Sequence, residues 1–450
     1  MAELLLDVRI DGFADPVGVL VRDPSGSLAY AYLPNYVAST ASIPISQSLP
    51  LTTEPYGDVV ARAFFDNLLQ ESDGPLRTVM DREGLARDDV AGLLYHLGKD
   101  CPGALSVLPA GAPPVKVPGV YATDYEELPD SRLNAIVRAL YDRRALPTGT
   151  GDPSPLAGVQ SKIGLTILPN GRFAEPKPGS GAPTTHILKV PDRHHRTAAR
   201  LEASALDLSR ATGTLTSTAR VQSIDGIDVL IVTRFDRAHD SEGRVVRLHQ
   251  EDFAQALGLP SSLKYERRGQ PARRFDVQAI RRVLDGTSEP TAARQTFIRN
   301  TLFDLLIGNG DGHAKNHAIL HMGQRRWTLT PRYDLVPTQL DTAVTDELSY
   351  RIGDAETRDQ ISEVSLHSFL VQLGITSRPA RRRLLIGEMR HLAQALVLQF
   401  SELDGRGQRV FCDLIASNIR GLLPLVGLDV PVEARDRDAF VPSGGGWRVS

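Results

Sequence analysis

A dense polar loop between two apolar segments is the feature that most restricts how this sequence can fold. The stretch LLIGNGDGHAKNHAIL, residues 305–320, begins and ends with residues that favour burial, and Asp, His, Lys and Asn are crowded between them. The glycines at 308, 310 and 312 allow backbone conformations that other residues resist. A fold that buries both flanks must hold these polar groups at a fixed place beside a core.

The loop has the residue order that phosphoryl transfer of the protein-kinase type requires. Asp311 and Asn316 have the spacing D-x-x-x-x-N, and two predicted strands, 317–320 and 325–330, lead from them to Asp334. In such a site one carboxylate orients the attacking hydroxyl and accepts its proton, while an Asn and a second Asp hold the metal ions that bridge the phosphates. Carboxylate and amide oxygens suit those ions. The alternative is that Asp311 and Asn316 are turn residues and that the rest of the loop is a solvated face.

Three upstream features favour the kinase interpretation. Small residues and Gly158 precede a predicted strand in SPLAGVQSKIGL, residues 154–165, where backbone N–H groups can approach phosphate oxygens. Lys189 lies in the apolar strand THILKVP and resembles a lysine that pairs with nucleotide phosphates, the alternative being a lysine at a sheet edge. The strand that ends at LIVTRFDR offers the backbone of residues 233–235 to an adenine ring. Each feature has an ordinary structural alternative, and their joint order supports the inference.

Length and composition set the wider frame. At 450 residues the chain is too long for a single hydrophobic core. A typical domain size of about 100–200 residues predicts two to four folding units. The formal charge of −3 means that any contact with nucleic acid must be a local patch. Two cysteines, Cys101 and Cys412, predict a reducing compartment without a disulfide scaffold. The chain lacks a signal peptide and a membrane span, so we expect a cytoplasmic protein.

Periodicity predicts strands first and helices later. Alternation over residues 4–34 predicts a β-meander, and helical spacing follows at 58–72 and 88–100. Strands are expected at 157–168, 185–191 and 227–237, whereas 169–184 is too rich in Pro and Gly for regular structure. Residues 145–156 are a linker or loop. The later helices are predicted at 250–258, 294–309, 365–374 and 379–403.

Several motifs together resemble a known family. GNGDGHAKN, YD at 333–334, AGVQSKIGL, RFDR followed by QEDFAQALG, and SSLKYE are similar to motifs of the HipA-type toxin kinases of bacterial toxin–antitoxin operons. SLPLT, FFDNLLQES and LGKDCPGALSVLP resemble the N-terminal subdomain of that family. The resemblance extends to about residue 400. It implies an α+β, two-lobed protein-kinase-like fold, with a β-rich N-terminal lobe, an extra N-terminal subdomain and a mostly helical C-terminal lobe.

The resemblance also implies domain boundaries. We expect the N-terminal subdomain at 1–145, the nucleotide-binding part of the N-terminal lobe at 146–258, and the helical catalytic lobe at 259–440. Residues 441–450 are expected to be a disordered tail.

In the terms of this family the chain would be a serine/threonine kinase that uses ATP and Mg²⁺. Asp311 would be the catalytic base, Asn316 and Asp334 the metal ligands, and Lys189 the phosphate-binding lysine. The residues expected to bind ATP are Leu156, Ala157, Gly158, Val159, Gln160, Ser161, Lys189, Thr233, Arg234, Phe235, His313, Lys315, Asn316, Tyr333 and Asp334. Thr233 departs from relatives that carry Glu there, so only a backbone contact to adenine is expected at this position.

The resemblance implies a toxin that arrests growth by phosphorylating a protein serine, on an aminoacyl-tRNA synthetase, and that a HipB-like helix-turn-helix antitoxin neutralises. It further implies operator DNA as a partner through the antitoxin complex, and no membrane. Two alternatives remain open, a small-molecule phosphotransferase and a catalytically minor kinase-like corepressor. A corepressor without catalysis would not need all four proposed active-site residues. This chain has Asp311, Asn316, Asp334 and Lys189, which argues against the corepressor.

Two further sites are predicted outside the proposed active centre. Ser154 is a candidate regulatory phosphosite, because a phosphate there would repel the phosphates of ATP; the alternative is a plain loop serine. The family resemblance implies that a serine at this position is autophosphorylated and that this switches the kinase off. Arg378, Arg381, Arg382 and Arg383 crowd the start of a predicted helix, where the helix dipole disfavours cations. An external anion, such as the phosphates of operator DNA, would relieve that cost. The alternative is a solvated helix end with acidic partners in the same chain.

Overall fold

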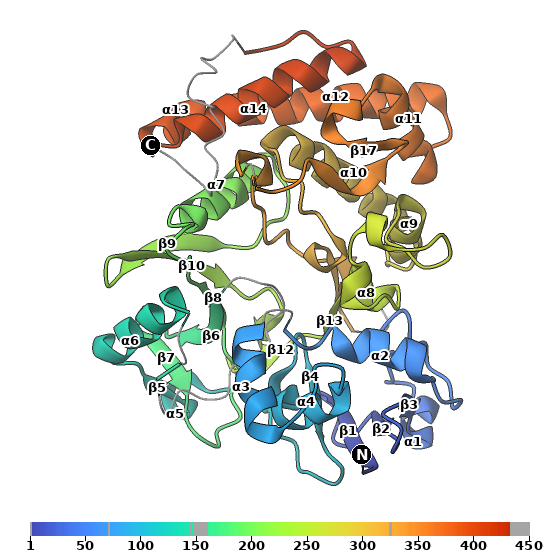
Figure 1. The fold of residues 1–450 in the computed structure, drawn as a ribbon, viewed down its shortest axis with the longest axis vertical. Helices are drawn as coiled ribbons and strands as arrows, with labels where there is room; N and C mark the ends of the chain where they lie inside the picture. The colour runs from blue at the N-terminus through green and yellow to red at the C-terminus, as the bar shows by residue number, and fades with distance from the viewer. Residues whose placement is uncertain are drawn as a thin grey trace. The chain divides into compact units, whose positions relative to one another are not determined.

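The computed structural model describes residues 2–70, 73–143, 146–147, 161–323, 326–341 and 343–432. The chain divides into two compact units and passes between them several times (Figure 1). Unit 1 comprises Met1–Asp192, Gln222–Ser262 and Ala318–Thr328, and unit 2 comprises Arg193–Val221, Leu263–His317 and Leu329–Ser450. The predicted tail at 441–450 lies outside the described residues, as does most of the predicted linker at 145–156. Where the chain is described, no helix has the length and apolar character needed to cross a membrane.

Unit 1 begins with a four-stranded antiparallel sheet. Its strand order is β3-β2-β1-β4, with β1 at Leu4–Ile10, β2 at Gly18–Arg22, β3 at Leu28–Tyr32 and β4 at Leu105–Pro109. Leu6, Val8 and Ile10 of β1 are buried in the core of this part of the chain, as the alternating pattern requires. The β-meander predicted for residues 4–34 is therefore confirmed.

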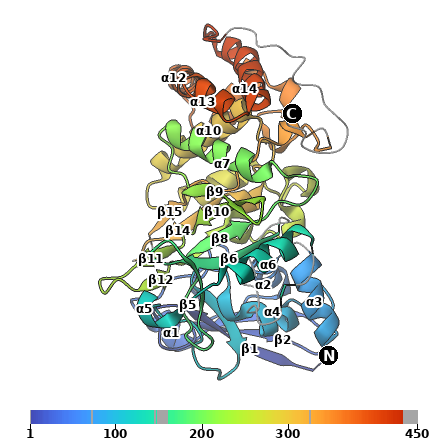
Figure 2. The ribbon, with the colours of Figure 1, turned by 90° about the vertical axis from the view of Figure 1, so that its left-hand side faces the viewer.

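Helices pack against this sheet (Figure 2). Helix α4, Val90–Leu97, contacts β1, β2 and β4, and α2, Asp58–Asp66, contacts β3. Asp89 caps α4 by accepting a hydrogen bond from the Gly92 amide at 2.9 Å, and it also pairs with buried Arg22 at 2.6 Å. A helix is found at each predicted place, although α2 ends at Asp66 and not at residue 72 as predicted. The structure adds α1 at Pro34–Ala38 and α3 at Asp73–Glu83, which the sequence pattern did not predict.

A six-stranded sheet follows, and all of it except residues 219–221 belongs to unit 1. Its order is β5-β7-β6-β8-β10-β9, with β5 at Tyr125–Glu127, β6 at Lys162–Ile167, β7 at Phe173–Pro176, β8 at His186–Lys189, β9 at Ala219–Ile224 and β10 at Ile227–Thr233. Helix α6, Asp130–Tyr141, packs its apolar face on this sheet in one shared core. Helix α5 spans Tyr121–Asp124.

Strand β7 corrects one prediction. It lies within residues 169–184, for which the Pro and Gly content predicted no regular structure. Phe173 and Ala174 are buried, and β7 pairs with both β5 and β6. Pairing on both sides satisfies the backbone groups of this short segment, and that outweighs its unfavourable composition.

Unit 1 is completed by smaller elements. A two-stranded sheet joins β11, Arg237–His239, to β12, Val245–Arg247. A three-stranded sheet has the order β13-β14-β15, with β13 at Gln250–Asp252, β14 at Ala318–His321 and β15 at Trp327–Leu329. Helix α8, Phe253–Ala256, follows β13 and is capped by Asp252. The hairpin predicted after the polar loop is confirmed by β14 and β15, whereas only part of the predicted helix at 250–258 is helical.

Unit 2 is mainly helical. Its elements are α7 at Ala198–Ala211, α9 at Val277–Asp285, α10 at Pro290–Ile307, β16 at Glu347–Ile352, β17 at Ala355–Thr357, α11 at Glu363–Gln372, α12 at Arg378–Val397, α13 at Phe400–Gly405 and α14 at Arg409–Leu422. Helix α10 contacts α9, α12 and α14. The helices predicted at 294–309 and 365–374 are confirmed. The helix predicted at 379–403 is two helices, because a turn at residues 398–399 separates α12 from α13.

Candidate functional site

The polar loop of unit 2 starts where α10 ends. Gly308 terminates the helix with φ of +74°, a conformation that favours glycine. A Cβ atom at this position would lie 2.8 Å from Leu414 Cδ2, so a larger residue would collide with the core. Within the loop, Asn309 Nδ2 donates to Asp304 Oδ1 at 2.9 Å, and Arg332 Nη2 donates to the same oxygen at 2.5 Å. A buried ion pair therefore anchors the first turn of the loop.

Asp311 is held through its backbone and its side chain. Its amide donates to Asn309 Oδ1 at 3.1 Å, and the phenol of Tyr265 donates to its Oδ1 at 2.7 Å. The preceding residue, Gly310, donates from its amide to Thr338 Oγ1 and accepts from Ser349 Oγ, both at 2.8 Å. Bonds on both sides of the chain leave the carboxylate little freedom to rotate.

Asn316 follows in a short 3₁₀ turn, Ala314–Asn316. Its side-chain Nδ2 donates to the Asp311 carbonyl at 2.7 Å, which ties together the two residues of the D-x-x-x-x-N motif. Because the nitrogen is used in this bond, the amide oxygen is the atom that remains to act as a ligand.

Asp334 has an unusual backbone conformation. Its φ of +56° is left-handed, and only two other non-glycine residues in the described parts of the chain have positive φ. Asp tolerates this region better than most residues, and such conformations often occur at functional sites. The neighbouring Tyr333 donates from its phenol to the Lys315 carbonyl at 2.9 Å, which fastens this segment to the polar loop.

His313 connects Asp334 electrostatically to the loop. Burial and, to a smaller extent, the charge of Lys264 lower the pKa of His313 to about 3, although Asp334 acts in the opposite direction. The imidazole is therefore neutral near pH 7. Its ring packs edge-on against Tyr265 at 5.2 Å between centroids. The loop, Tyr265 and Asp334 thus form one connected group within unit 2.

The oxygen donors of this group suit a magnesium ion. Asn316 supplies an amide oxygen and Asp334 a carboxylate, both of which are ligands that Mg²⁺ accepts. Nowhere in the described residues do three or more His, Cys, Asp or Glu side chains gather as a metal site would require. A kinase-type site, with few protein ligands and the remainder from phosphate oxygens, does not need such a cluster.

In unit 1, Lys189 lies at the end of β8, an interior strand of the six-stranded sheet. It is cross-strand neighbour to Leu230 of β10 and to Lys162 of β6, and only 7% of it is exposed. The alternative of a sheet-edge lysine is therefore wrong. Interior burial of an ammonium group is uncommon without a charged partner or ligand.

The predicted adenine-binding segment follows β10. Thr233 is exposed, but the Arg234 amide donates to the Thr185 carbonyl at 3.0 Å and is not available to a ligand. The Arg234 side chain is buried and forms two bonds to Asp236, at 2.9 and 2.8 Å. Arg234 is thus part of the structure of unit 1, and the expected backbone contact is restricted to Thr233 and Phe235.

The predicted phosphate loop is largely outside the described residues. Ser154, Leu156, Ala157, Gly158, Val159 and Gln160 are not described. Ser161 is described, and its carbonyl accepts a hydrogen bond at 2.9 Å from the amide of Val190, the residue that follows Lys189.

The arginine cluster lies at the start of α12, with Pro379 in the first turn as predicted. Arg378, Arg382 and Arg383 are exposed. Arg381 is half-buried and donates to the carbonyls of Ile375 and Thr376. Among the described residues, none of the four arginines has a carboxylate within ion-pair distance. The alternative in which acidic residues of the same chain neutralise the cluster therefore has no support among the described residues.

The residues that support the loop were not predicted from the sequence. Tyr265 belongs to SSLKYE, which contributed only to the family resemblance, and Asp304 and Asn309 received no role. Asp304 could have been found, since it is a carboxylate inside the apolar run TLFDLLI and must have a buried partner. Nothing in the sequence indicates that Tyr265 contacts Asp311.

Comparisons with known proteins point to one family. The model of the HipA-like C-terminal domain matches residues 154–396, and that of the HipA N-terminal domain matches residues 6–108. "Putative kinase Y4mE" of Sinorhizobium fredii is 32% identical over 384 residues, which are 85% of this chain and 89% of the relative. "Serine/threonine-protein kinase toxin HipA" of Shewanella oneidensis is 29% identical over 386 residues, 80% of this chain and 81% of the relative.

A solved structure shares the fold. It is that of the Shewanella oneidensis MR-1 toxin–antitoxin system, HipA and HipB with operator DNA, and it matches with a TM-score of 0.77 and 25% identity. The match covers 94% of this chain and 98% of the solved chain. The fold is therefore the mixed α and β, two-lobed kinase-like fold expected from the sequence. With both family models and the relatives in agreement, the chain belongs to the HipA family.

Proposed function

We propose that this chain is a serine/threonine protein kinase that transfers the γ-phosphoryl group of ATP to a protein serine. Asp311 orients the serine hydroxyl and accepts its proton. Asn316 and Asp334 hold magnesium, and Lys189 pairs with phosphates of the nucleotide. The observation that carries the proposal is the fixed position of the Asp311 carboxylate, which Tyr265 and the tethered backbone of the loop restrain.

The chemistry depends on positioning and on charge. When bound, magnesium would neutralise the charge that develops on the phosphates. Asp311 is attached through its carbonyl to Asn316, so that the residue that accepts the proton and a residue that holds the metal move together. The neutral ring of His313 adds no positive charge beside Asp311, and its burial helps to exclude water from the loop.

Two relatives support a proposal for the biological role. A related chain is named a serine/threonine-protein kinase toxin, and a solved relative forms a complex with HipB and operator DNA. We infer that this chain is the toxin of a toxin–antitoxin pair, that a helix-turn-helix antitoxin neutralises it, and that an aminoacyl-tRNA synthetase is its substrate. Exposed arginines of α12 would contact operator DNA. Autophosphorylation of Ser154 stays a prediction.

The decisive experiment replaces Asp311 by Asn. This change keeps the shape of the side chain and an acceptor for Tyr265, but it removes the base. We expect phosphoryl transfer from labelled ATP to protein serine to fall by at least about 10²–10³-fold, because the group acts on charge in the transition state. The melting temperature should stay within a few degrees. Asp240→Asn, which changes an aspartate in a turn of unit 1 that bonds to its neighbours in the chain, is the matched control.

Expression in bacteria separates the proposal from its alternatives. A kinase toxin should arrest growth as the wild type and not as Asp311→Asn. Absence of growth arrest with both proteins would favour the corepressor. Transfer of phosphate to small molecules without labelling of protein would favour the small-molecule phosphotransferase.

A further inference from the structure

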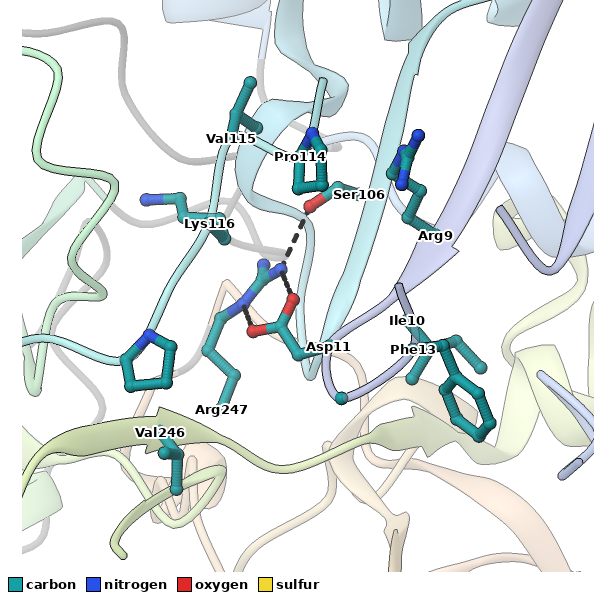
Figure 3. Close-up of a pocket in the computed structure, with 12 residues that line it drawn as sticks. Arg9, Ile10, Asp11, Phe13, Ser106, Pro114, Val115, Lys116, Val246 and Arg247 are labelled. Atoms are coloured by element: carbon teal, nitrogen blue, oxygen red, sulfur yellow. Dashed lines mark hydrogen bonds and ion pairs between the residues drawn. The ribbon is translucent and has the colours of Figure 1, made fainter. Parts of the chain in front are cut away.

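Unit 1 contains a cavity of about 230 Å³ that has no role in the proposed kinase chemistry (Figure 3). Its walls come from four separate segments: the end of β1 with the turn that follows it, Ser106 of β4, residues 114–118 after β4, and strand β12. None of the described residues named above for nucleotide or metal binding lines it.

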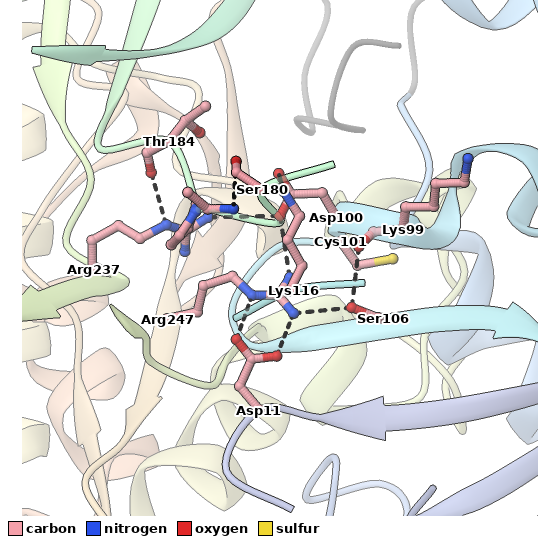
Figure 4. Close-up of polar contacts among 12 residues, drawn as sticks. Asp11, Lys99, Asp100, Cys101, Ser106, Lys116, Ser180, Thr184, Arg237 and Arg247 are labelled. Carbon is pink, nitrogen blue, oxygen red and sulfur yellow. Dashed lines mark hydrogen bonds and ion pairs between the residues drawn. The ribbon is translucent and has the colours of Figure 1, made fainter. Parts of the chain in front are cut away.

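Arg247 forms one wall of the cavity as a fixed cation. Its side chain is fully buried, and it donates to both carboxylate oxygens of Asp11, at 2.8 and 2.5 Å. It also donates to Asp100 Oδ1 at 3.1 Å and to Ser106 Oγ at 2.9 Å (Figure 4). These bonds hold the guanidinium in one orientation, so Arg247 supports the wall and is not itself free to turn toward a ligand.

Lys116 and Arg9 add two more positive charges. Lys116 Nζ lies 3.1 Å from Asp100 Oδ2, so Lys116 shares that carboxylate with Arg247. Arg9 differs from both. Its Nη atoms donate to the carbonyls of Ala14, at 3.1 Å, and Ala112, at 3.2 Å, and its buried Nε–H has no acceptor within the described part of the chain. Among the described residues no carboxylate lies within ion-pair distance of Arg9.

The charges around the cavity therefore do not cancel. Three cations, Arg9, Lys116 and Arg247, line the cavity beside one carboxylate, Asp11. Asp100, which lies outside the lining, pairs with Lys116 and Arg247, so Arg9 is the cation left without a counter-charge among the described residues. Burial lowers the pKa of Lys116 from its ordinary value, although Asp100 opposes this effect. An uncompensated cation in a partly desolvated place is unfavourable, and a bound anion would relieve it.

The remaining walls define the other half of the ligand. Ile10, Phe13, Val115 and Val246, with Pro114 and Pro118, give the cavity apolar sides. Apolar walls with a few convergent polar groups are typical of small-molecule sites. One guanidinium without a counter-charge matches one carboxylate, with which it forms parallel hydrogen bonds.

We propose that this cavity binds a small carboxylic acid with an apolar body. The carboxylate pairs with the guanidinium of Arg9, which has no counter-charge among the described residues, and the body packs between the apolar walls. The site is independent of the proposed kinase centre, and its ligand is distinct from ATP.

The test is isothermal titration calorimetry of the full-length protein with benzoate at constant ionic strength. We expect benzoate to bind, and benzyl alcohol, which has the same ring without the charge, not to bind. Arg9→Gln should weaken benzoate binding by about 10- to 100-fold, because it removes a charged hydrogen-bonding group. Arg172→Gln is the matched control, since this exposed arginine of unit 1 pairs with Glu127 and neither residue lines the cavity.

A second variant guards against misfolding as an explanation. Val246→Phe places a ring in the cavity and keeps every charge, so it should abolish binding with an unchanged circular dichroism spectrum. The proposal is overturned if benzoate does not bind, if binding survives both variants, or if saturating ATP displaces it. Tighter binding of phenyl phosphate than of benzoate, by about tenfold or more, would overturn the assignment to carboxylates.

Discussion

At the scale of single residues, the contact between Tyr265 and Asp311 is the most informative. The phenol donates a 2.7 Å hydrogen bond to the carboxylate of the proposed base, and Arg267 lies over the ring at 4.3 Å. Tyr265 is thus a positioning residue: it touches the base and would act through it. Its importance can be measured by deleting only the hydroxyl group.

We predict that Tyr265→Phe lowers kcat about 10- to 100-fold, the range for losing a hydrogen bond to a charged group. The KM for ATP should change little, because the hydroxyl does not belong to the groups assigned to the nucleotide. Steady-state kinetics separates the two constants. Tyr95→Phe, which removes a hydroxyl from an exposed tyrosine, is the control. Equal loss in kcat and in ATP affinity would mean that Tyr265 serves the fold of the loop and not the base.

In unit 1, Lys189 is the residue proposed to pair with the phosphates of ATP. Lys189→Met retains the length of the buried stem and removes the ammonium group. We expect weaker ATP binding by calorimetry, with the melting temperature maintained. Lys177→Met is the control, because this exposed lysine donates to a backbone carbonyl, that of Thr123. Unchanged ATP affinity would show that the interior position of Lys189 has a structural cause.

At the scale of elements, the sequence predicted best where a pattern is long or where a motif dictates a turn. Helix α10 and the β14–β15 hairpin follow from apolar spacing alone. Strand β7 does not, since it exists through pairing with β5 and β6, and local composition argues against it. In the candidate site, Asp311, Asn316 and Asp334 could be chosen by their spacing. Tyr265 could not, because it meets Asp311 only through tertiary structure.

Strand β13 contains a carboxyl group that should make stability depend on pH. Glu251 is fully buried, and burial raises its pKa to about 8, although hydrogen bonds from Ser46 Oγ and the Gln47 amide oppose the shift. The unfolded value is about 4.3. Between these values the folded state binds more protons than the unfolded state, so the contribution of Glu251 is complete below about pH 4.3 and is lost as the pH rises toward 8.

We therefore predict that Glu251→Gln, which stays neutral, gains stability relative to the wild type as the pH rises from about 5 to about 8. Each pH unit in this window should add up to about 1.4 kcal/mol to the difference in the free energy of unfolding. Urea denaturation at several pH values measures it. The exposed residue Glu54 provides the control variant Glu54→Gln. A difference that does not change with pH would show that Glu251 is ionised in the folded protein.

At the scale of the whole molecule, the arginines of α12 are predicted to join the complex with antitoxin and operator DNA. Replacing Arg382 and Arg383 by Ala should weaken binding of the complex to operator DNA and reduce the slope of log K against log salt by about 0.9 for each phosphate that is no longer neutralised. Arg381→Ala is the comparison, since Arg381 bonds to carbonyls of its own chain and should lower the melting temperature more than it changes the slope. If the affinity and the slope of the double variant are unaltered, this surface does not contact DNA.

The division into two units is the part of the molecule that local sequence cannot reveal. Composition and motifs predict domains that are each one continuous stretch of sequence, and the domain boundaries given above remain predictions. The compact units are interleaved, because each is assembled from three separate segments. Such an arrangement depends on pairs of segments that are distant in the chain, as when β13 meets β14, and no single window of sequence contains both.

Interleaving has a consequence for the nascent chain on the ribosome. Strand β13 ends at residue 252, and its partner β14 begins at residue 318. At about 5–20 residues per second, translation takes roughly 3 to 13 s to cover this interval. Throughout that time the edge of β13 has no β14 to pair with, and an unpaired edge is a template for other chains. The protein should therefore be most vulnerable to aggregation, and most dependent on chaperones, between the emergence of these two strands.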